Sequence, residues 1–385
     1  MKNILFVIST LTGGGAERTV STLSKFFSEE MNCTVLLNSQ SENDYNFCGD
    51  VISLGMKPRV KKNIVYQIIA AIKRYTKLKE LKKTGKYDVV VSFMESANFL
   101  NVITGKNNCK LILSVRNVIS EEYRGIYKVI LYVARKLYGR ADYVVSLSEG
   151  ARRDLIDNMR VPEDKCITIY NGYDISKFHY VEKKNKKAFI SMGRLVHQKG
   201  QWHLIRAFNR VNKLYPETTL KILGQGELEG YLRKLIEYYG LENSVELIGF
   251  VNNPAEYLQE SSCFVFSSVY EGFGNAIIEA MMNGLPVITS EFSVAREILA
   301  PELATEEIVG HTLACQYGIL VPSSSPEYKE PSQVLGVDEI ELANAMIGWV
   351  EGKYGNKYNN LVLRECLERF SIDKAIDRWK RIIYE

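Results

Sequence analysis

The stretch Cys263–Thr289 reads CFVFSSVYEGFGNAIIEAMMNGLPVIT. It begins with a short apolar run, Cys263–Phe266, and ends with another, Val287–Thr289. Between them, a glycine-bearing loop leads into residues 276–282, which are apolar except for Glu279 and have the length of a short helix. A strand, a loop, a helix and a second strand in this order form the repeating unit of a parallel sheet covered by helices.

The same alternation extends over the whole chain. Amphipathic stretches such as Ala16–Phe27, with Val20 and Leu23 on one face, separate β-branched runs. We expect the other strands at Ile4–Ile8, Cys33–Leu37, Val89–Phe93, Leu111–Val115, Tyr143–Leu147, Ala188–Met192, Leu220–Leu223 and Val245–Ile248. The sequence therefore predicts an α/β protein with doubly wound parallel sheets.

The length of 385 residues exceeds what one hydrophobic core normally organises, so we expect two domains. The turn Asn171-Gly172 and the polar, lysine-rich residues 181–187 mark the boundary between them. We assign residues 1–180 to an N-terminal domain and residues 181–370 to a C-terminal domain. Residues 371–385 form a helix that opens with a serine, and we expect it to pack back toward the N-terminal domain.

Composition narrows the class of protein. Hydrophobic residues make up 46% and charged residues 24%, which excludes a disordered or fibrous chain. The first apolar run is too short for a signal peptide and no later stretch has the length of a membrane span, so we expect a cytosolic protein. The seven cysteines are scattered and form no CxxC pair, so we expect neither a metal site nor another cofactor.

Charge is distributed unevenly along the chain. Residues 1–180 hold 27 Lys and Arg against 18 Asp and Glu, whereas residues 181–385 hold 22 against 27. Much of the excess lies in the segment 57–86, where Ile64, Ile68, Ile72 and Tyr75 also recur at helical spacing. This segment is either a helix that lies on an anionic membrane surface or a domain helix with a solvated basic face. We expect no nucleic-acid partner.

Two glycine-bearing loops follow predicted strands. Gly13–Arg18 comes after the first strand and opens the first helix, a position where backbone N–H groups bind phosphate, although a purely structural turn fits equally well. Gly193-Arg194 and Lys199-Gly200 follow the first strand of the second domain. Arg194 and Lys199 would clamp a diphosphate there, or they belong to a solvated surface.

The strongest motif is Glu271-Gly272-Phe273-Gly274, followed by the helix that carries Glu279. Because its neighbours are apolar, we expect Glu279 to be buried and to need hydrogen-bond partners, which the hydroxyls of a ribose would supply. The backbone N–H groups of residues 273–275 would face an anion or a sugar hydroxyl. The structural alternative makes Glu271 a charge at a helix entry and pairs Glu279 with a core arginine.

Together these motifs resemble glycosyltransferase family 4, whose members have the GT-B fold and act with retention and without a metal. The resemblance also rests on Gly224-Gln225-Gly226, Gly284-Leu285-Pro286-Val287, Asn171-Gly172-Tyr173-Asp174, Arg296-Glu297-Ile298-Leu299 and Gly318-Ile319-Leu320-Val321, and covers nearly the whole chain.

The resemblance implies a role for each motif. Arg194 and Lys199 would hold the donor diphosphate together with Gly193 and Gly224, and Glu271 would contact the transferred sugar. Glu279 would bind the ribose beside Phe273, Gly274 and Asn275. Gly14, Gly15 and Ala16 would reach the phosphates from the other domain, which supplies the acceptor side.

One departure concerns the first domain, whose single histidine, His179, lies at its very end, far in sequence from the predicted strand Leu111–Val115. Some relatives carry a histidine in the loop where this chain has Arg116 and Asn117. We therefore name Arg116, Asn117 and Glu95 as candidates for contacts to the acceptor, although a core or surface arginine would explain Arg116 equally well.

The sequence thus predicts transfer of a hexose or N-acetylhexosamine from a nucleotide diphosphate sugar, for which we expect UDP, to a saccharide acceptor on a lipid, in the synthesis of a surface polysaccharide. We expect the enzyme on the inner face of the cell membrane or free in the cytosol. The alternatives are a sugar-nucleotide epimerase on the same fold and a non-catalytic subunit that binds nucleotide sugars.

Overall fold

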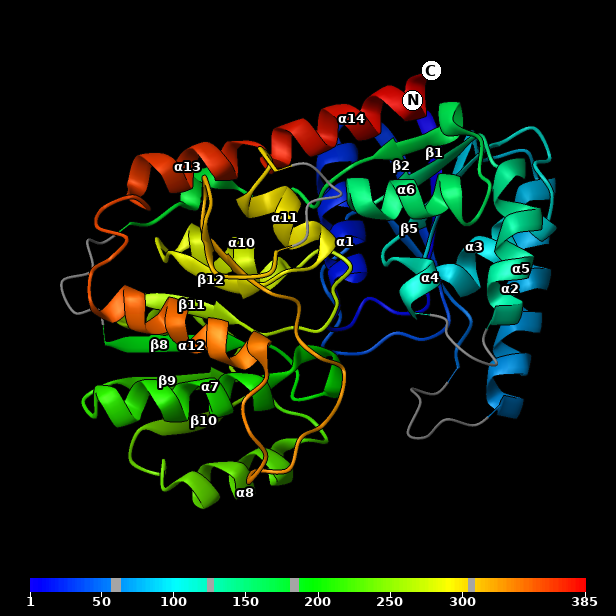
Figure 1. The fold of residues 1–385 in the computed structure, drawn as a ribbon. Helices are drawn as coiled ribbons and strands as arrows, with labels where there is room; N and C mark the ends of the chain where they lie inside the picture. Colours follow the sequence, from blue (N-terminus) through cyan, green and yellow to red (C-terminus); the bar gives the residue numbers. More distant parts are fainter. Residues whose placement is uncertain (57–63, 123–127, 181–186, 304–308) are drawn as a thin grey trace. The chain divides into compact units, whose positions relative to one another are not determined.

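The computed structural model describes residues 1–56, 64–122, 128–180, 187–303 and 309–385 (Figure 1). Two predicted features therefore lie largely outside the described residues. They are the linker expected at residues 181–187 and the first part of the basic segment, residues 57–63. Contacts divide the chain into two units. Unit 1 comprises Met1–Gly172 and Ile372–Glu385, and unit 2 comprises Tyr173–Ser371.

Unit 1 is built on a parallel sheet with the strand order β3-β2-β1-β4-β5-β6-β7. The central strands are apolar and buried on both faces, as parallel strands between two helical layers must be. The strands are β1 (Lys2–Val7), β2 (Met31–Leu37), β3 (Asp50–Ser53), β4 (Val89–Phe93), β5 (Lys110–Val115), β6 (Tyr143–Ser146) and β7 (Cys166–Thr168).

Helices cover both faces of this sheet (Figure 1). On one face α1 (Gly15–Phe27) and α14 (Ile372–Tyr384) pack on the strands, and Trp379 stacks on Phe93 with ring centroids 6.0 Å apart. The remaining helices of the unit are α2 (Ile64–Lys83), α3 (Glu95–Ile103), α4 (Ile119–Glu122), α5 (Lys128–Leu137) and α6 (Glu149–Asp157). Alternate residues of each strand therefore belong to two separate cores.

Unit 2 repeats the design with the strand order β10-β9-β8-β11-β12-β14-β13. Only the pairing of β13 with β14 is antiparallel among the described strands. The strands are β8 (Ala188–Met192), β9 (Thr219–Leu223), β10 (Val245–Gly249), β11 (Cys263–Phe266), β12 (Val287–Ser290), β13 (Leu313–Ala314) and β14 (Ile319–Val321). The predicted class of two doubly wound parallel-sheet domains is confirmed.

The helices of unit 2 are α7 (Gln201–Leu214), α8 (Glu229–Tyr239), α9 (Ala255–Glu260), α10 (Asn275–Met282), α11 (Ser293–Leu299), α12 (Val337–Val350) and α13 (Asn360–Glu368). Two of them, α7 and α12, are joined by a buried ionic cluster. Between β14 and α12 the chain forms a loop without helix or strand over residues 322–336.

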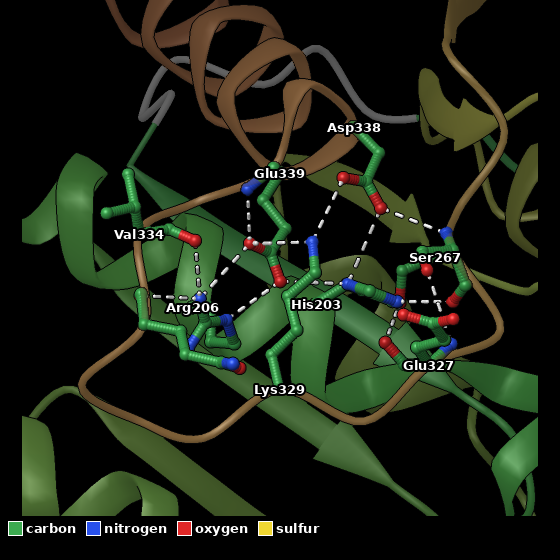
Figure 2. A network of polar contacts seen from close by, with 12 residues as sticks. His203, Arg206, Ser267, Glu327, Lys329, Val334, Asp338 and Glu339 are labelled. Atoms are coloured by element: carbon green, nitrogen blue, oxygen red, sulfur yellow. Dashed lines mark hydrogen bonds and ion pairs between the residues drawn. The ribbon is translucent and has the colours of Figure 1, made fainter.

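Glu339 of α12 is the centre of that cluster (Figure 2). Its Oε1 accepts hydrogen bonds from Arg206 Nε at 2.8 Å and from His203 Nδ1 at 2.9 Å, and its Oε2 accepts one from the Gly336 backbone N–H at 2.9 Å. Arg206 also donates to the carbonyls of residues 330 and 333, and His203 Nε2 faces the Ser325 carbonyl at 2.8 Å. Helix α7, helix α12 and the loop 322–336 are thereby held together.

Helix α2 exposes part of the apolar stripe that its sequence shows. Ile68 and Ile72 of that stripe, and Val65 and Ile69 beside them, each have at least 45% of their surface in solvent. The buried face instead includes Arg74 and Lys82. None of the helices in the described part of the chain combines the length and apolar composition of a membrane span.

The buried cluster generates a prediction about acid stability. Burial alone would raise the pKa of Glu339, but hydrogen bonds from His203 and Arg206 outweigh it and hold the pKa at about 2. A carboxyl whose pKa is lowered by folding stabilises the protein above its unfolded pKa and loses this effect as the pH falls toward its folded pKa. Glu339→Gln should therefore lower the free energy of unfolding by about 3 to 5 kcal/mol at pH 7, because it leaves a buried guanidinium unpaired.

Urea unfolding between pH 7 and pH 2 checks this expectation. The difference between wild type and variant should shrink as the pH falls from about 5 to about 2. Glu351→Gln serves as the control, because Glu351 follows the same helix but is exposed, and its loss should cost under about 1 kcal/mol. Equal stability of the two variants at pH 7 would contradict the role given to Glu339.

Candidate functional site

The main candidate site of unit 2 lies where two loops leave neighbouring strands. Strands β8 and β11 pair in parallel, so the loops that follow them, residues 193–200 and 267–274, begin at the same edge of the sheet. This carboxyl edge is where open α/β sheets bind ligands. The two predicted motifs, more than 70 residues apart in sequence, are therefore brought to one place by the topology.

Lys199 and Glu271 form an ion pair across these loops. Lys199 Nζ lies 2.5 Å from Glu271 Oε1, and Ser268 Oγ donates to the same oxygen at 2.8 Å. Both charged side chains are largely buried, with 14% and 8% of their surfaces exposed, and the ammonium also lies 5.0 Å from the centre of the Phe266 ring. Glu271 Oε2 makes no hydrogen bond to any described residue, so one oxygen of this carboxylate remains for a ligand.

Backbone contacts lock the two loops together. Gly200 has φ 59°, and a Cβ at this position would collide with the carbonyl oxygen of Ser267, so only glycine fits. Ser267 Oγ donates to the Gly200 carbonyl at 2.9 Å, and the Val269 N–H donates to the Gln198 carbonyl at 2.9 Å. The position of Lys199 relative to Glu271 is thus set by hydrogen bonds to the main chain of the first loop.

Arg194 occupies the outer part of the same loop. The Gln201 side chain donates to the Arg194 carbonyl at 3.0 Å, while the Arg194 side chain points to solvent and makes no ion pair within the described residues. Behind it, Gly224 approaches Gly193 so closely that a Cβ on Gly224 would collide with the Gly193 carbonyl. One exposed cation and one buried, paired cation therefore stand on a single loop.

Helix α10 begins at the end of the second loop. Gly274 has φ 76° and precedes Asn275, whose Oδ1 accepts a hydrogen bond from the Tyr173 hydroxyl at 2.6 Å. Phe273 is buried against Phe370. The expectation that Glu279 is buried is wrong: it is half-buried, because α10 buries its other face.

In unit 1 the glycine-rich turn opens helix α1 as predicted, with Gly14 before the helix and Gly15 and Ala16 in its first turn. The carboxylate of Glu17 folds back onto it, so that a Cβ on Gly14 would collide with Glu17 Oε2. Burial raises the pKa of this carboxyl, against the opposing charge of Arg116. A carboxylate of the protein thus already faces this helix N-terminus.

The three acceptor candidates of unit 1 lie beyond β4 and β5. Arg116 is buried and donates from Nη2 to Thr19 Oγ1 and to Asn171 Oδ1, both at 2.6 Å, which is what the core-arginine alternative predicts. Asn117 beside it is half-buried, and Glu95 is buried in the first turn of α3.

Comparison with known proteins decides the family. Residues 13–177 match the family model described as Glycosyltransferase Family 4, and residues 173–310 match that of Glycosyl transferases group 1. An uncharacterized glycosyltransferase of Methanocaldococcus jannaschii is 34% identical over 84% of this chain and 85% of its own length. The chain belongs to glycosyltransferase family 4.

Two further comparisons agree with this assignment. A Campylobacter jejuni protein named N-acetylgalactosamine-N,N'-diacetylbacillosaminyl-diphospho-undecaprenol 4-alpha-N-acetylgalactosaminyltransferase is 28% identical over 78% of this chain and 84% of its own length. The crystal structure of Anabaena Alr3699/HepE in complex with UDP superposes with a TM-score of 0.75, at 21% identity and with both chains fully covered. The protein is a glycosyltransferase with the GT-B fold.

Sequence reasoning missed residues that complete the candidate site. Ser268 holds Glu271 within its own loop, Gln198 connects the two loops through the Tyr270 carbonyl, and His203 ties the first turn of α7 to residue 325. The two adjacent serines after β11, Ser267 and Ser268, are a signal that the sequence does show. The partner of His203, in contrast, lies 122 residues away and leaves no local pattern. In the described ranges, no group of three or more His, Cys, Asp and Glu residues is arranged to hold a metal ion.

Proposed function

We propose that the protein transfers a hexose or N-acetylhexosamine from a UDP-sugar to a saccharide acceptor carried on a lipid diphosphate, with retention of configuration and without a metal ion. The observation that carries the proposal is the Lys199–Glu271 pair beside the exposed Arg194 at the carboxyl edge of the second sheet. The solved relative with bound UDP and the relative named for a diphospho-undecaprenol substrate support the donor and the acceptor class.

The chemistry follows from where charge develops. Transfer breaks the bond between the anomeric carbon and the diphosphate, forms the bond to the acceptor hydroxyl, and passes the hydroxyl proton to the departing diphosphate. Negative charge accumulates on that diphosphate, and Arg194 and Lys199 would stabilise it as preorganised cations. They would supply the charge that other transferases obtain from a divalent metal ion.

Glu271 would act on the transferred sugar through its second oxygen. Oε1 is engaged by Lys199 and Ser268, which orients the carboxylate, while Oε2 is left to accept a hydrogen bond from a sugar hydroxyl. Glu279 lies one helical turn after Asn275 on α10 and would accept hydrogen bonds from the ribose hydroxyls. The N–H groups of residues 273–275 would contact the donor at the start of that helix.

We also infer that the enzyme works at the surface of an anionic membrane, where a lipid-linked acceptor resides. The exposed isoleucines of α2 stand beside exposed lysines at positions 73, 79 and 83. Apolar side chains that insert into the interface and cations that attract anionic lipid are the two features of an interfacial helix. Arg74, which the charge pattern of the sequence also favoured for this contact, is buried and takes no part in it.

The first prediction concerns the diphosphate clamp. A panel of UDP- and GDP-sugars, tested by calorimetry, identifies the donor, and UDP release with undecaprenyl-diphosphate-linked N-acetylglucosamine then measures transfer. Arg194→Ala or Lys199→Ala should lower turnover about a hundredfold or more, because each removes a charge-assisted contact to the leaving group. Arg233→Ala is the control, since Arg233 is exposed and, among the described residues, its ion pair is with Glu229 on the neighbouring turn of α8.

The same assay tests the other parts of the proposal. Turnover should persist in EDTA, and strict dependence on added Mn²⁺ would contradict the metal-free mechanism. Near wild-type turnover of both clamp variants would remove Arg194 and Lys199 from the mechanism. Conversion of the donor to an epimer, or tight binding with no reaction, would identify one of the two alternative functions.

A further prediction concerns Glu279. Glu279→Gln keeps the shape but gives up the charge, so the affinity for UDP should fall by about 1 to 3 kcal/mol with little change in melting temperature. Calorimetry with UDP and thermal unfolding on the same sample measure both quantities. Glu256→Gln, an exposed carboxylate of α9, should change neither. A lower melting temperature with unchanged UDP affinity would show that Glu279 is structural.

The membrane surface is tested with vesicles. Replacing Lys73, Lys79 and Lys83 by Gln should release the protein from vesicles of phosphatidylglycerol and phosphatidylcholine, since each cation near such a surface contributes about 1 kcal/mol. Ile68→Ser with Ile72→Ser should weaken binding even at low salt, which separates the apolar from the electrostatic contribution. The control replaces Lys213, Lys234 and Lys353 of unit 2, also exposed. Equal binding of all variants would favour a solvated basic face.

A further inference from the structure

Arg74 is a buried charge without a counter-ion. It lies midway along α2, and only 3% of its surface is exposed. No carboxylate of the described residues lies within ion-pairing distance of its guanidinium. Burying a cation in this way costs several kcal/mol unless something compensates for its lost hydration.

All three partners of Arg74 are uncharged. Nε donates to Asn38 Oδ1 at 2.9 Å, Nη1 to Ser96 Oγ at 3.3 Å and Nη2 to Ser9 Oγ at 2.9 Å. A guanidinium has five N–H donors, so two remain after these three bonds. Burial lowers the pKa of Arg74 to about 10, and no neighbouring charge offsets this effect.

Lys82, also a buried cation of α2, is satisfied by hydrogen-bond acceptors of the protein alone. Its Nζ donates to the Asn101 carbonyl at 2.6 Å, to Thr104 Oγ1 at 2.9 Å and to the Gly105 carbonyl at 2.8 Å. These acceptors use all three of its N–H groups and lie at the C-terminal end of α3, where the helix dipole favours a positive charge. Arg74 has neither a full set of acceptors nor such a dipole.

The position of Arg74 in the fold points to a ligand. Ser9 follows β1, Asn38 follows β2, and Ser96 stands in the first turn of α3 after β4. In the order β3-β2-β1-β4 the chain turns to opposite sides of β1, which places the topological switch point of this sheet between β1 and β4. By bonding both Ser9 and Ser96, the guanidinium spans that point.

Two features make this place accessible and unusual. Ser96 is exposed and Ser9 is half-buried, so the rim above the guanidinium is open to solvent. Met94, which precedes α3, has φ 72° and ψ 154°, a conformation that costs a non-glycine residue energy and that recurs at ligand sites.

We propose that Arg74, with Ser9 and Ser96, binds a phosphate group of the acceptor, namely the diphosphate that joins the saccharide to its carrier. A phosphate supplies the missing negative charge and accepts hydrogen bonds from the two unused guanidinium N–H groups and from the two hydroxyls. This inference rests on the proposed function, because it gives the lipid-linked acceptor a recognition site in unit 1.

Binding of inorganic pyrophosphate in the presence of saturating UDP tests the site directly, because UDP occupies the donor clamp. Pyrophosphate should raise the melting temperature of the wild type and bind in calorimetry. Arg74→Gln should weaken this binding about tenfold or more, and Ser96→Ala, at the exposed rim, by a few-fold. Lys82→Gln is the matched control: it also removes a buried cation from α2 and should lower stability while pyrophosphate binding persists.

Unchanged pyrophosphate binding in both Arg74→Gln and Ser96→Ala would overturn the site, as would an equal loss in Lys82→Gln. Kinetics then distinguish carrier diphosphate from free phosphate. The wild type should show a lower KM for undecaprenyl-diphosphate-linked N-acetylglucosamine than for octyl N-acetylglucosaminide. In Arg74→Gln the ratio of these two KM values should move toward one. Equal ratios in both proteins would overturn the acceptor role. Absence of transfer to either acceptor tests the proposed function alone, since the pyrophosphate experiment does not depend on turnover.

Discussion

The geometry of the loop that carries Lys199 depends on one fully buried carboxylate, Glu339. It receives hydrogen bonds from Arg206 and His203 of α7, and through them it holds α7, α12 and the loop 322–336 in one arrangement. The first turn of α7 follows directly on the loop that carries Lys199. Because the two charges are buried together, removing either Glu339 or Arg206 would leave a buried ion without its counter-ion, so the cluster disfavours other arrangements of these elements. The ion pair between Lys199 and Glu271 is built on this support.

Local sequence patterns predicted the elements that are long, apolar and buried. Three expected strands, Val89–Phe93, Ala188–Met192 and Cys263–Phe266, have the bounds seen in the structure, because parallel strands between two helical layers are continuously apolar. The strands that escaped prediction, such as Asp50–Ser53 and Cys166–Thr168, lie at the outer positions of the first sheet and are too short to show a period. The motif residues Lys199 and Glu271 could be named in advance, but their contact could not, since it joins residues 72 apart.

Helix α2 shows what periodicity alone leaves undecided. Its isoleucines recur at helical spacing, which fits either a membrane-facing stripe or one that packs on the domain. In the structure Ile68 and Ile72 are exposed, while Arg74 and Lys82 are buried beside apolar residues. The acceptors that make this possible, on Asn38, Ser96 and the C-terminal end of α3, come from other parts of the chain. Hydrophobic patterns describe the average preference of a side chain for the core, and they contain no information about distant polar partners.

The buried cations Lys199 and Arg74 are held in opposite ways, and this has a consequence for binding. Lys199 is neutralised by Glu271, so an anion that approaches it must compete with a carboxylate already in contact. Arg74 has only neutral partners, so an anion there meets a desolvated charge that nothing offsets. Binding of a phosphate at Arg74 would therefore release more free energy than binding at Lys199, because the cost of burying the guanidinium is already included in the folded state. The paired Lys199, in contrast, would stabilise an anion most when the negative charge of that anion increases beyond its ground-state value. Such an increase occurs on a leaving diphosphate during transfer.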